Sequence, residues 1–386
     1  MKQTLFLCIF TVIPLLGMKG AHVVQPVPLK NIAHFESKRC KQLLQEVVQQ
    51  RENSGYAGRF VMKLTPYPET TFVVWGPLKG SSTSFMRTLS SIQTLGIIDP
   101  YLKIVHQDTY LVFNGDAISD SETSLETLML ILTLMKINPT QVLYIKGEAE
   151  QELQWQNDGL KKALQQKSFS FPGQKSSITK LISRFFNTLP LALYITGLNP
   201  LDGALRISYF PRTSREIDET HCGKTLTSAL LNVPQICSLS PAEKAPVHIK
   251  ATITSEQRLM SYQQHPGLTL VEPDKGSVTW SIFSGPTPHY QREYQFFRDA
   301  FALIKTGKSI DEALIELYSA DLRTGENIHL VGSYDIMTGI ERNPRQLSKK
   351  PSRNLGENIV SMYTQLESLI AQATRLTELL IERGDT

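Results

Sequence analysis

A strand, a helix and a second strand follow one another between residues 110 and 145. Strand-like residues run from Tyr110 to Phe113 and from Gln141 to Ile145, and the stretch SETSLETLMLILTLMKI between them is helix-like. This succession predicts a right-handed crossover between two parallel strands. Ligands of such sheets bind where strands end and helices begin. Asp116, in the turn FNGDAISDSE after the first strand, therefore stands at a candidate functional position.

The remaining pattern predicts an α/β protein with further strands and helices. Ser119 and Glu122 have capping-box spacing, which predicts that the helix after Asp116 begins near residue 120. An amphipathic helix is expected at Phe35 to Arg51, lying on the main domain, and residues 291 to 319 also have helical periodicity. Three more strands are expected, at Thr71 to Trp75, Leu189 to Ile195 and Ser277 to Phe283.

Composition bounds the class of protein. The chain has 386 residues, 41% of them hydrophobic, and can bury one large core or two ordinary ones. Its formal net charge of +4 is small for this length, and no basic stripe with interleaved aromatic residues occurs. The sequence therefore gives no indication of nucleic-acid binding.

The first residues predict export. Lys2 is followed by an apolar run from Leu5 to Met18, which Thr11, Pro14 and Gly17 interrupt. The run is too short for a stable membrane span and is typical of a secretory signal peptide. We therefore expect a secreted or periplasmic protein with no membrane span after cleavage; an uncleaved membrane anchor is the alternative.

Three cysteines remain after the signal peptide: Cys40, Cys222 and Cys237. In an oxidising compartment Cys222 and Cys237 can form a disulfide, and the alternative is that all three are buried thiols. Their spacing matches no zinc motif.

The motifs between Val73 and Glu150 carry a family resemblance. GPLKG, LVFNGDAISD and KGEAE stand in the order and spacing of the first three motifs of calcineurin-like metallophosphoesterases. The chain resembles the serine/threonine phosphoprotein phosphatase branch over about residues 59 to 290. The resemblance implies a sandwich of mixed sheets flanked by helices. It also implies two divalent ions, Mn, Fe or Zn, that polarise a phosphate and generate a hydroxide nucleophile.

The first motif and part of the second lack the metal-binding and phosphate-binding residues of the family. Where the family has a metal-binding Asp and His, this chain has Pro77 and Lys79, neither of which binds a cation. Asp116 matches the family's bridging Asp. The next Asp of the family falls on Ser119, and its phosphate-binding Arg falls on Asp120.

The later motifs are equally changed. The family's Asn and catalytic His fall on Glu148 and Ala149, and Glu150 is the one functional match in KGEAE. The two later histidines have only Ser208 and an out-of-register His248 as counterparts. If a metal binds, the resemblance leaves Asp116, Glu148 and His248 as its ligands; otherwise His248 is an ordinary strand histidine.

The substitutions suggest a replacement for the lost cations. Asp116, Asp120 and Glu148 would repel one another unless a positive charge joined them. Lys79 can supply that charge, so a Lys79–Asp116 ion pair is predicted within a cleft that Glu148 also lines. The alternative is a Lys79 side chain that points to solvent.

The C-terminal region predicts a long helix. Apolar residues recur at steps of three and four from Ile359 to Leu380, which is typical of a coiled-coil seam, although additional apolar residues widen the stripe. The helix therefore either self-associates or packs on the chain's own helices. The expected units are a signal peptide (1–21), an N-terminal helical segment (22–58), a metallophosphoesterase-like domain (59–290), a helical or mixed extension (291–341), a basic linker (342–354) and a C-terminal amphipathic helix (355–386).

Two functions follow from these motifs. The first is a catalytically inactive pseudophosphatase that binds or scaffolds a protein partner. The second is a divergent metal-dependent phosphoesterase that uses Asp116, Glu148 and His248. The substituted motifs favour the first.

Overall fold

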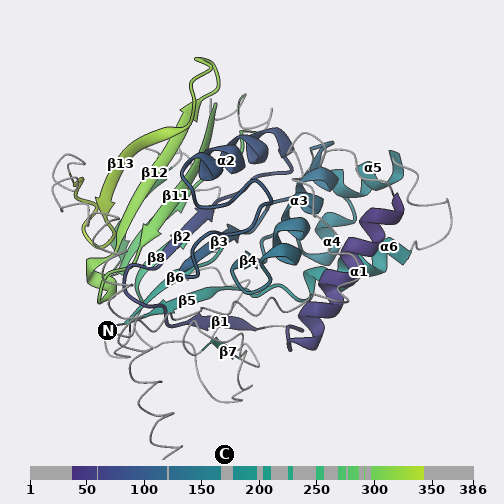
Figure 1. Ribbon diagram of the computed structural model, residues 1–386, viewed down its shortest axis with the longest axis horizontal. Helices are drawn as coiled ribbons and strands as arrows, with labels where there is room; N and C mark the ends of the chain where they lie inside the picture. Colours follow the sequence, from purple (N-terminus) through teal and green to yellow (C-terminus); the bar gives the residue numbers. More distant parts are fainter. Residues whose placement is uncertain are drawn as a thin grey trace, which may run out of the picture.

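The computed structural model describes residues 37–58, 60–119, 121–166, 177–197, 203–209, 225–228, 249–255, 268–274, 277–286, 291 and 297–342. Its strands form two sheets (Figure 1). Within these residues no helix is both long and apolar enough to cross a membrane.

The six-stranded sheet has the order β13-β12-β11-β2-β3-β4. Strands β2 (Thr71–Trp75), β3 (Thr109–Asn114) and β4 (Val142–Ile145) are parallel, and the pairing of β3 with β4 confirms the predicted parallel strands on either side of the helix. An antiparallel ladder continues the sheet from β2 through β11 (Arg298–Lys305), β12 (Leu314–Asp321) and β13 (His329–Asp335).

The seven-stranded sheet has the order β7-β1-β5-β6-β8-β10-β9 and mixes parallel with antiparallel pairs. Two of its members, β5 and β10, confirm predicted strands. The strands are β1 (Val61–Leu64), β5 (Leu193–Thr196), β6 (Ala204–Ile207), β7 (Thr225–Ser228), β8 (Ile249–Thr254), β9 (Leu268–Asp274) and β10 (Ser277–Ile282).

One core lies between the two sheets and another lies under the helices. Alternating residues of both sheets form the first, among them Val74, Val112, Ile253 and Trp280. The opposite face of β2, β3 and β4 is covered by α1 (Ser37–Asn53), α2 (Ser82–Thr94), α3 (Ser124–Ile137), α4 (Glu152–Trp155), α5 (Gly159–Gln166) and α6 (Ser177–Phe186) (Figure 1). The expected α/β architecture of mixed sheets flanked by helices is confirmed.

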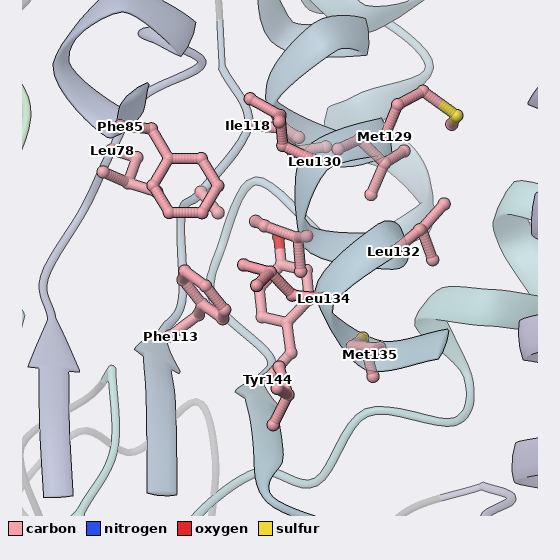
Figure 2. Packing of buried hydrophobic residues seen from close by; sticks show 14 of the residues in the cluster. Leu78, Phe85, Phe113, Ile118, Met129, Leu130, Leu132, Leu134, Met135 and Tyr144 are labelled. Atoms are coloured by element: carbon pink, nitrogen blue, oxygen red, sulfur yellow. The ribbon is translucent and has the colours of Figure 1, made fainter. Parts of the chain in front are cut away.

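Helix α3 is the centre of this second core. Its buried residues include Leu130, Leu134 and Met135, and its side chains pack beside Phe113 and Tyr144 of the sheet (Figure 2). Helices α1, α2 and α5 all contact it, which explains why its sequence is apolar on nearly every side.

Helix α1 is the predicted amphipathic helix, and its last turn contains the buried Arg51. The Arg51 side chain donates to the Thr188 hydroxyl at 2.9 Å and to the Thr188 carbonyl at 2.6 Å. Its guanidinium also lies 4.2 Å from the centre of the Tyr56 ring. Burial lowers the pKa of Arg51 to about 10. These contacts hold α1 against the residues that follow α6.

The helical interpretation of residues 291 to 319 is wrong. Strand β11 and most of β12 occupy this stretch, and their pairing with β2 places them in the same sheet as the candidate site. Both faces of β11 are buried, so its apolar residues form a continuous run that lacks the alternation of a half-exposed strand.

Several sequence predictions fall outside the described residues. These are the signal peptide, the C-terminal helix and its linker, the Cys222–Cys237 pair, Asp120 and His248. Cys40 is buried on α1.

Candidate functional site

The candidate site lies where β2, β3 and β4 end. The three strands are parallel neighbours, with Trp75 beside Phe113 and Asn114 beside Ile145. Their carboxyl ends therefore meet at one edge of the sheet, as predicted. The loops that follow them carry Lys79, Asp116 and Glu150.

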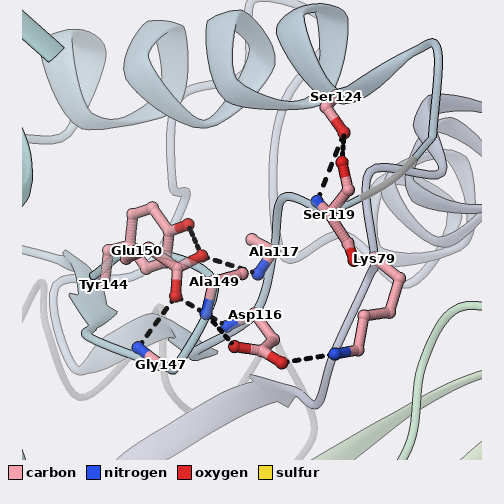
Figure 3. A network of polar contacts seen from close by, with 9 residues as sticks. All are labelled: Lys79, Asp116, Ala117, Ser119, Ser124, Tyr144, Gly147, Ala149 and Glu150. Atoms are coloured by element: carbon pink, nitrogen blue, oxygen red, sulfur yellow. Dashed lines mark hydrogen bonds and ion pairs between the residues drawn. The ribbon is translucent and has the colours of Figure 1, made fainter. Parts of the chain in front are cut away.

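Lys79 and Asp116 form the predicted ion pair. The Lys79 ammonium contacts Asp116 Oδ2, and the two side chains are 8% and 2% exposed (Figure 3). The Lys79 backbone N–H also donates to the Asp116 carbonyl at 3.0 Å. Both residues have a positive φ, 50° at Lys79 and 49° at Asp116.

The second carboxylate oxygen of Asp116 is also bonded. Asp116 Oδ1 accepts a hydrogen bond of 2.8 Å from the Ala149 backbone N–H (Figure 3). One carboxylate therefore joins all three loops, with the loop after β2 on one oxygen and the loop after β4 on the other.

Glu150 is fully buried and accepts four hydrogen bonds. The Tyr144 hydroxyl donates at 2.6 Å, and three backbone N–H groups donate from Gly147 at 2.8 Å, Asp116 at 2.9 Å and Ala117 at 3.0 Å (Figure 3). Burial, and next the neighbouring Asp116 charge, raise the pKa of Glu150 to about 7. Burial, and next the charge of the Glu150 carboxylate, hold the pKa of Tyr144 well above its usual range.

In the sequence, Glu150 is recognisable only as a motif match, and no motif indicates a role for Tyr144. The strand pattern predicted that Tyr144 lies in β4, but its hydroxyl partner depends on the loop geometry. A tyrosine six residues before a motif glutamate, at the end of a buried strand, was the available signal.

The other predicted site residues differ in burial and in the contacts that they make. Ala149 and Pro77 are buried, and Pro77 offers only its carbonyl, which accepts from Gly285 N–H at 3.0 Å. Glu148 is exposed, in contrast to Ala149 and Glu150 beside it. Glu148 is therefore not a member of the buried carboxylate pair.

The predicted capping box is wrong. Helix α3 begins at Ser124, four residues later than expected, and the side chain of its cap residue Thr123 makes no cap hydrogen bond. Instead Thr123 Oγ1 donates to the Gly80 carbonyl at 2.6 Å. Ser124 Oγ bonds the N–H and the carbonyl of Ser119 at 3.2 and 2.7 Å (Figure 3). The Thr123 hydroxyl therefore joins two loops, and the Ser124 hydroxyl closes the turn that begins at Ser119.

The loop after β2 is also held against the other sheet. Gly76 N–H donates to Ser284 Oγ at 2.8 Å, just beyond the end of β10. A Cβ atom on Gly76 would lie 2.1 Å from the Ile282 carbonyl oxygen, so only glycine permits this approach. The start of the loop that carries Lys79 is therefore held against the segment that follows β10.

The described residues do not fit the two-metal centre that the resemblance implies. Both oxygens of the Asp116 carboxylate are engaged, one of them by the Lys79 ammonium. Both oxygens of Glu150 accept two hydrogen bonds each. In the described part of the chain, no three His, Cys, Asp or Glu side chains gather as a metal site requires.

Comparison with known proteins adds a distant likeness. No family model matches the chain, and no curated protein does. Among solved structures, the chain is similar to a protein serine/threonine phosphatase from Saccharomyces cerevisiae with similarity to human phosphatase PP5. That match covers 70% of this chain and 83% of the other, with 16% sequence identity and a TM-score of 0.43.

Proposed function

We propose that this chain is a pseudophosphatase, a non-catalytic binding or scaffold protein on a metallophosphoesterase-like fold. The observation that carries the proposal is the buried ion pair between the Lys79 ammonium and Asp116. A metal ion could bind Asp116 only by displacing the Lys79 ammonium, which is part of the chain and is buried beside the carboxylate.

The residues around the pair support the same conclusion. Ala149 stands where the resemblance implies a catalytic histidine, and a methyl group cannot donate a proton to a leaving group. General acid catalysis is typically worth about 10² to 10⁴-fold in rate. The Ala149 backbone N–H, the one polar group this residue brings to the centre, is already bonded to Asp116.

Export and a protein partner belong to the proposal. The apolar run from Leu5 to Met18 supports a secreted or periplasmic protein. The apolar stripe between Ile359 and Leu380 supports a helix that binds a partner or a second copy of the chain.

An activity assay tests the proposal against the divergent phosphoesterase. Purified protein with added Mn²⁺ should give no hydrolysis of p-nitrophenyl phosphate above the buffer rate. Hydrolysis that disappears in both Asp116→Ala and Glu148→Gln would establish the phosphoesterase instead. Exposed Glu326, in the loop between β12 and β13, provides the control. Activity lost in Glu326→Gln as well would indicate general damage, and activity kept in every variant would indicate a contaminating enzyme.

A further inference from the structure

The backbone at the ion pair is unusual for the residues that occupy it. Lys79 and Asp116 both adopt left-handed φ values, although each is adjacent to a glycine that does so without strain, Gly80 at 77° and Gly115 at 74°. Aspartate visits this region more readily than most residues, and lysine has no such tendency. A strained lysine persists where its surroundings hold it.

The Lys79 side chain brings a positive charge to a centre that holds two buried carboxyl groups, and it contacts one of them. Asp116 is in direct contact with it, and Glu150 bonds the Asp116 backbone from the next loop. Asp116 is 1% exposed and Glu150 is fully buried. Carboxylates this deeply buried are costly unless a cation compensates them.

The ammonium also acts at a distance, through Asp116. Removing it would leave Asp116 Oδ2 without its cation, while Oδ1 still holds the Ala149 N–H of the loop after β4. Backbone bonds from Lys79 and Gly80 to the carbonyls of Asp116 and Ala117, at 3.0 and 2.8 Å, join the first two loops beside the pair. Lys79 is thus placed to order all three loops.

We infer that the Lys79 ammonium group serves as the cation of an enclosed site at Asp116. The ligands that fit this site are primary alkylammonium ions. The site keeps the three loops ordered without a bound metal. This inference rests on the proposed non-catalytic centre and specifies what takes the place of catalytic ions there.

Chemical rescue tests the inference. Lys79→Ala removes the ammonium and three methylene groups but keeps the Cβ atom, so the backbone strain is retained. Propylammonium chloride supplies the missing atoms. The melting temperature of Lys79→Ala should fall below that of wild type and then rise with propylammonium concentration to a plateau, because a ligand stabilises the fold that binds it.

Two additives and one variant are the controls. 1-Propanol has nearly the same shape without the charge, and tetramethylammonium chloride has the charge without an N–H donor. Lys103→Ala makes the same substitution at an exposed lysine. Neither additive should rescue Lys79→Ala, and propylammonium should not raise the melting temperature of Lys103→Ala. Equal responses to all three additives, or no response to any, would overturn the inference.

If Lys79→Ala does not fold, a double-variant comparison tests whether the Lys79 charge compensates that of Asp116. Lys79→Met fills the buried space without charge, and Asp116→Asn removes the charge that it would leave behind. Lys79→Met should lower the midpoint of urea unfolding much less in the Asp116→Asn background than in wild type. Equal losses in the two backgrounds would overturn the inference. These measurements need no turnover, so they remain distinct from the activity assay.

Discussion

Glu150 should make the stability of this protein depend on pH. Burial and the nearby Asp116 charge raise its pKa from 4.5 to about 7 in the folded protein. The folded state therefore holds the Glu150 proton more tightly than the unfolded chain does. The stability that this group contributes is fully present below pH 4.5 and is lost as the pH rises through 7.

The size of the effect follows from the two pKa values. One pKa unit corresponds to about 1.4 kcal/mol, so full ionisation of Glu150 should lower the free energy of unfolding by about 3 kcal/mol. Most of that loss, about 2 to 3 kcal/mol, should fall between pH 5 and pH 8. The four hydrogen-bond donors around the carboxylate oppose this effect, because they favour the ionised form.

Urea unfolding of wild type and Glu150→Gln at pH 5 and pH 8 measures the difference. Glutamine does not titrate, so the stability advantage of wild type over this variant should shrink between the two pH values by the amount given above. Glu152→Gln, the same change at an exposed site, should show no such trend. A wild-type advantage that is equal at both pH values would show that the donors outweigh burial and that Glu150 is already ionised in the fold.

Three further predictions concern contacts at the site and elsewhere in the fold. Asp116→Asn should lower the free energy of unfolding by about 1 to 3 kcal/mol, and added Mn²⁺ should leave its melting temperature and that of wild type unchanged; a rise confined to wild type would identify Asp116 as a metal ligand. Arg51→Met should cost about 2 to 4 kcal/mol in urea unfolding, because two buried hydrogen bonds to Thr188 are lost, and a loss under about 0.5 kcal/mol would contradict this. Gly76→Ala should cost about 3 kcal/mol or more, since its new methyl group meets backbone of the facing sheet. Gly55→Ala has open space and should cost only about 1 to 2 kcal/mol for its positive φ, so equal losses at the two glycines would refute the steric argument.

The sequence predicted what depends on pattern and charge. The buried parallel strands β2, β3 and β4 are short apolar runs with clear turn signals, and the structure contains all three. The ion pair followed from charge: a buried Asp116 needed a cation, and Lys79 was the one residue of its motif that could provide it. These features can be predicted from the sequence because each has few alternatives: a short apolar run between turns is a buried strand, and one cation is available to Asp116.

What the sequence missed depends on how loops meet. The spacing of Ser119 and Glu122 predicted a helix cap, but the Thr123 hydroxyl bonds the neighbouring loop at Gly80 and the Ser124 hydroxyl bonds Ser119 within its own loop. The four donors to Glu150 come from four different residues whose convergence no local pattern encodes. Strand β11 was mistaken for a helix because burial of both faces removes the alternation that identifies a strand.

The metal content of the purified protein tests the central claim most directly. The protein would be produced in medium supplemented with Mn, Fe and Zn, purified without chelators, and analysed by inductively coupled plasma mass spectrometry together with its Lys79→Ala variant. The closed Lys79–Asp116 pair predicts far less than one metal ion per wild-type chain. One or two tightly held ions per chain would contradict the account, because they would require Asp116 to leave Lys79 and bind metal.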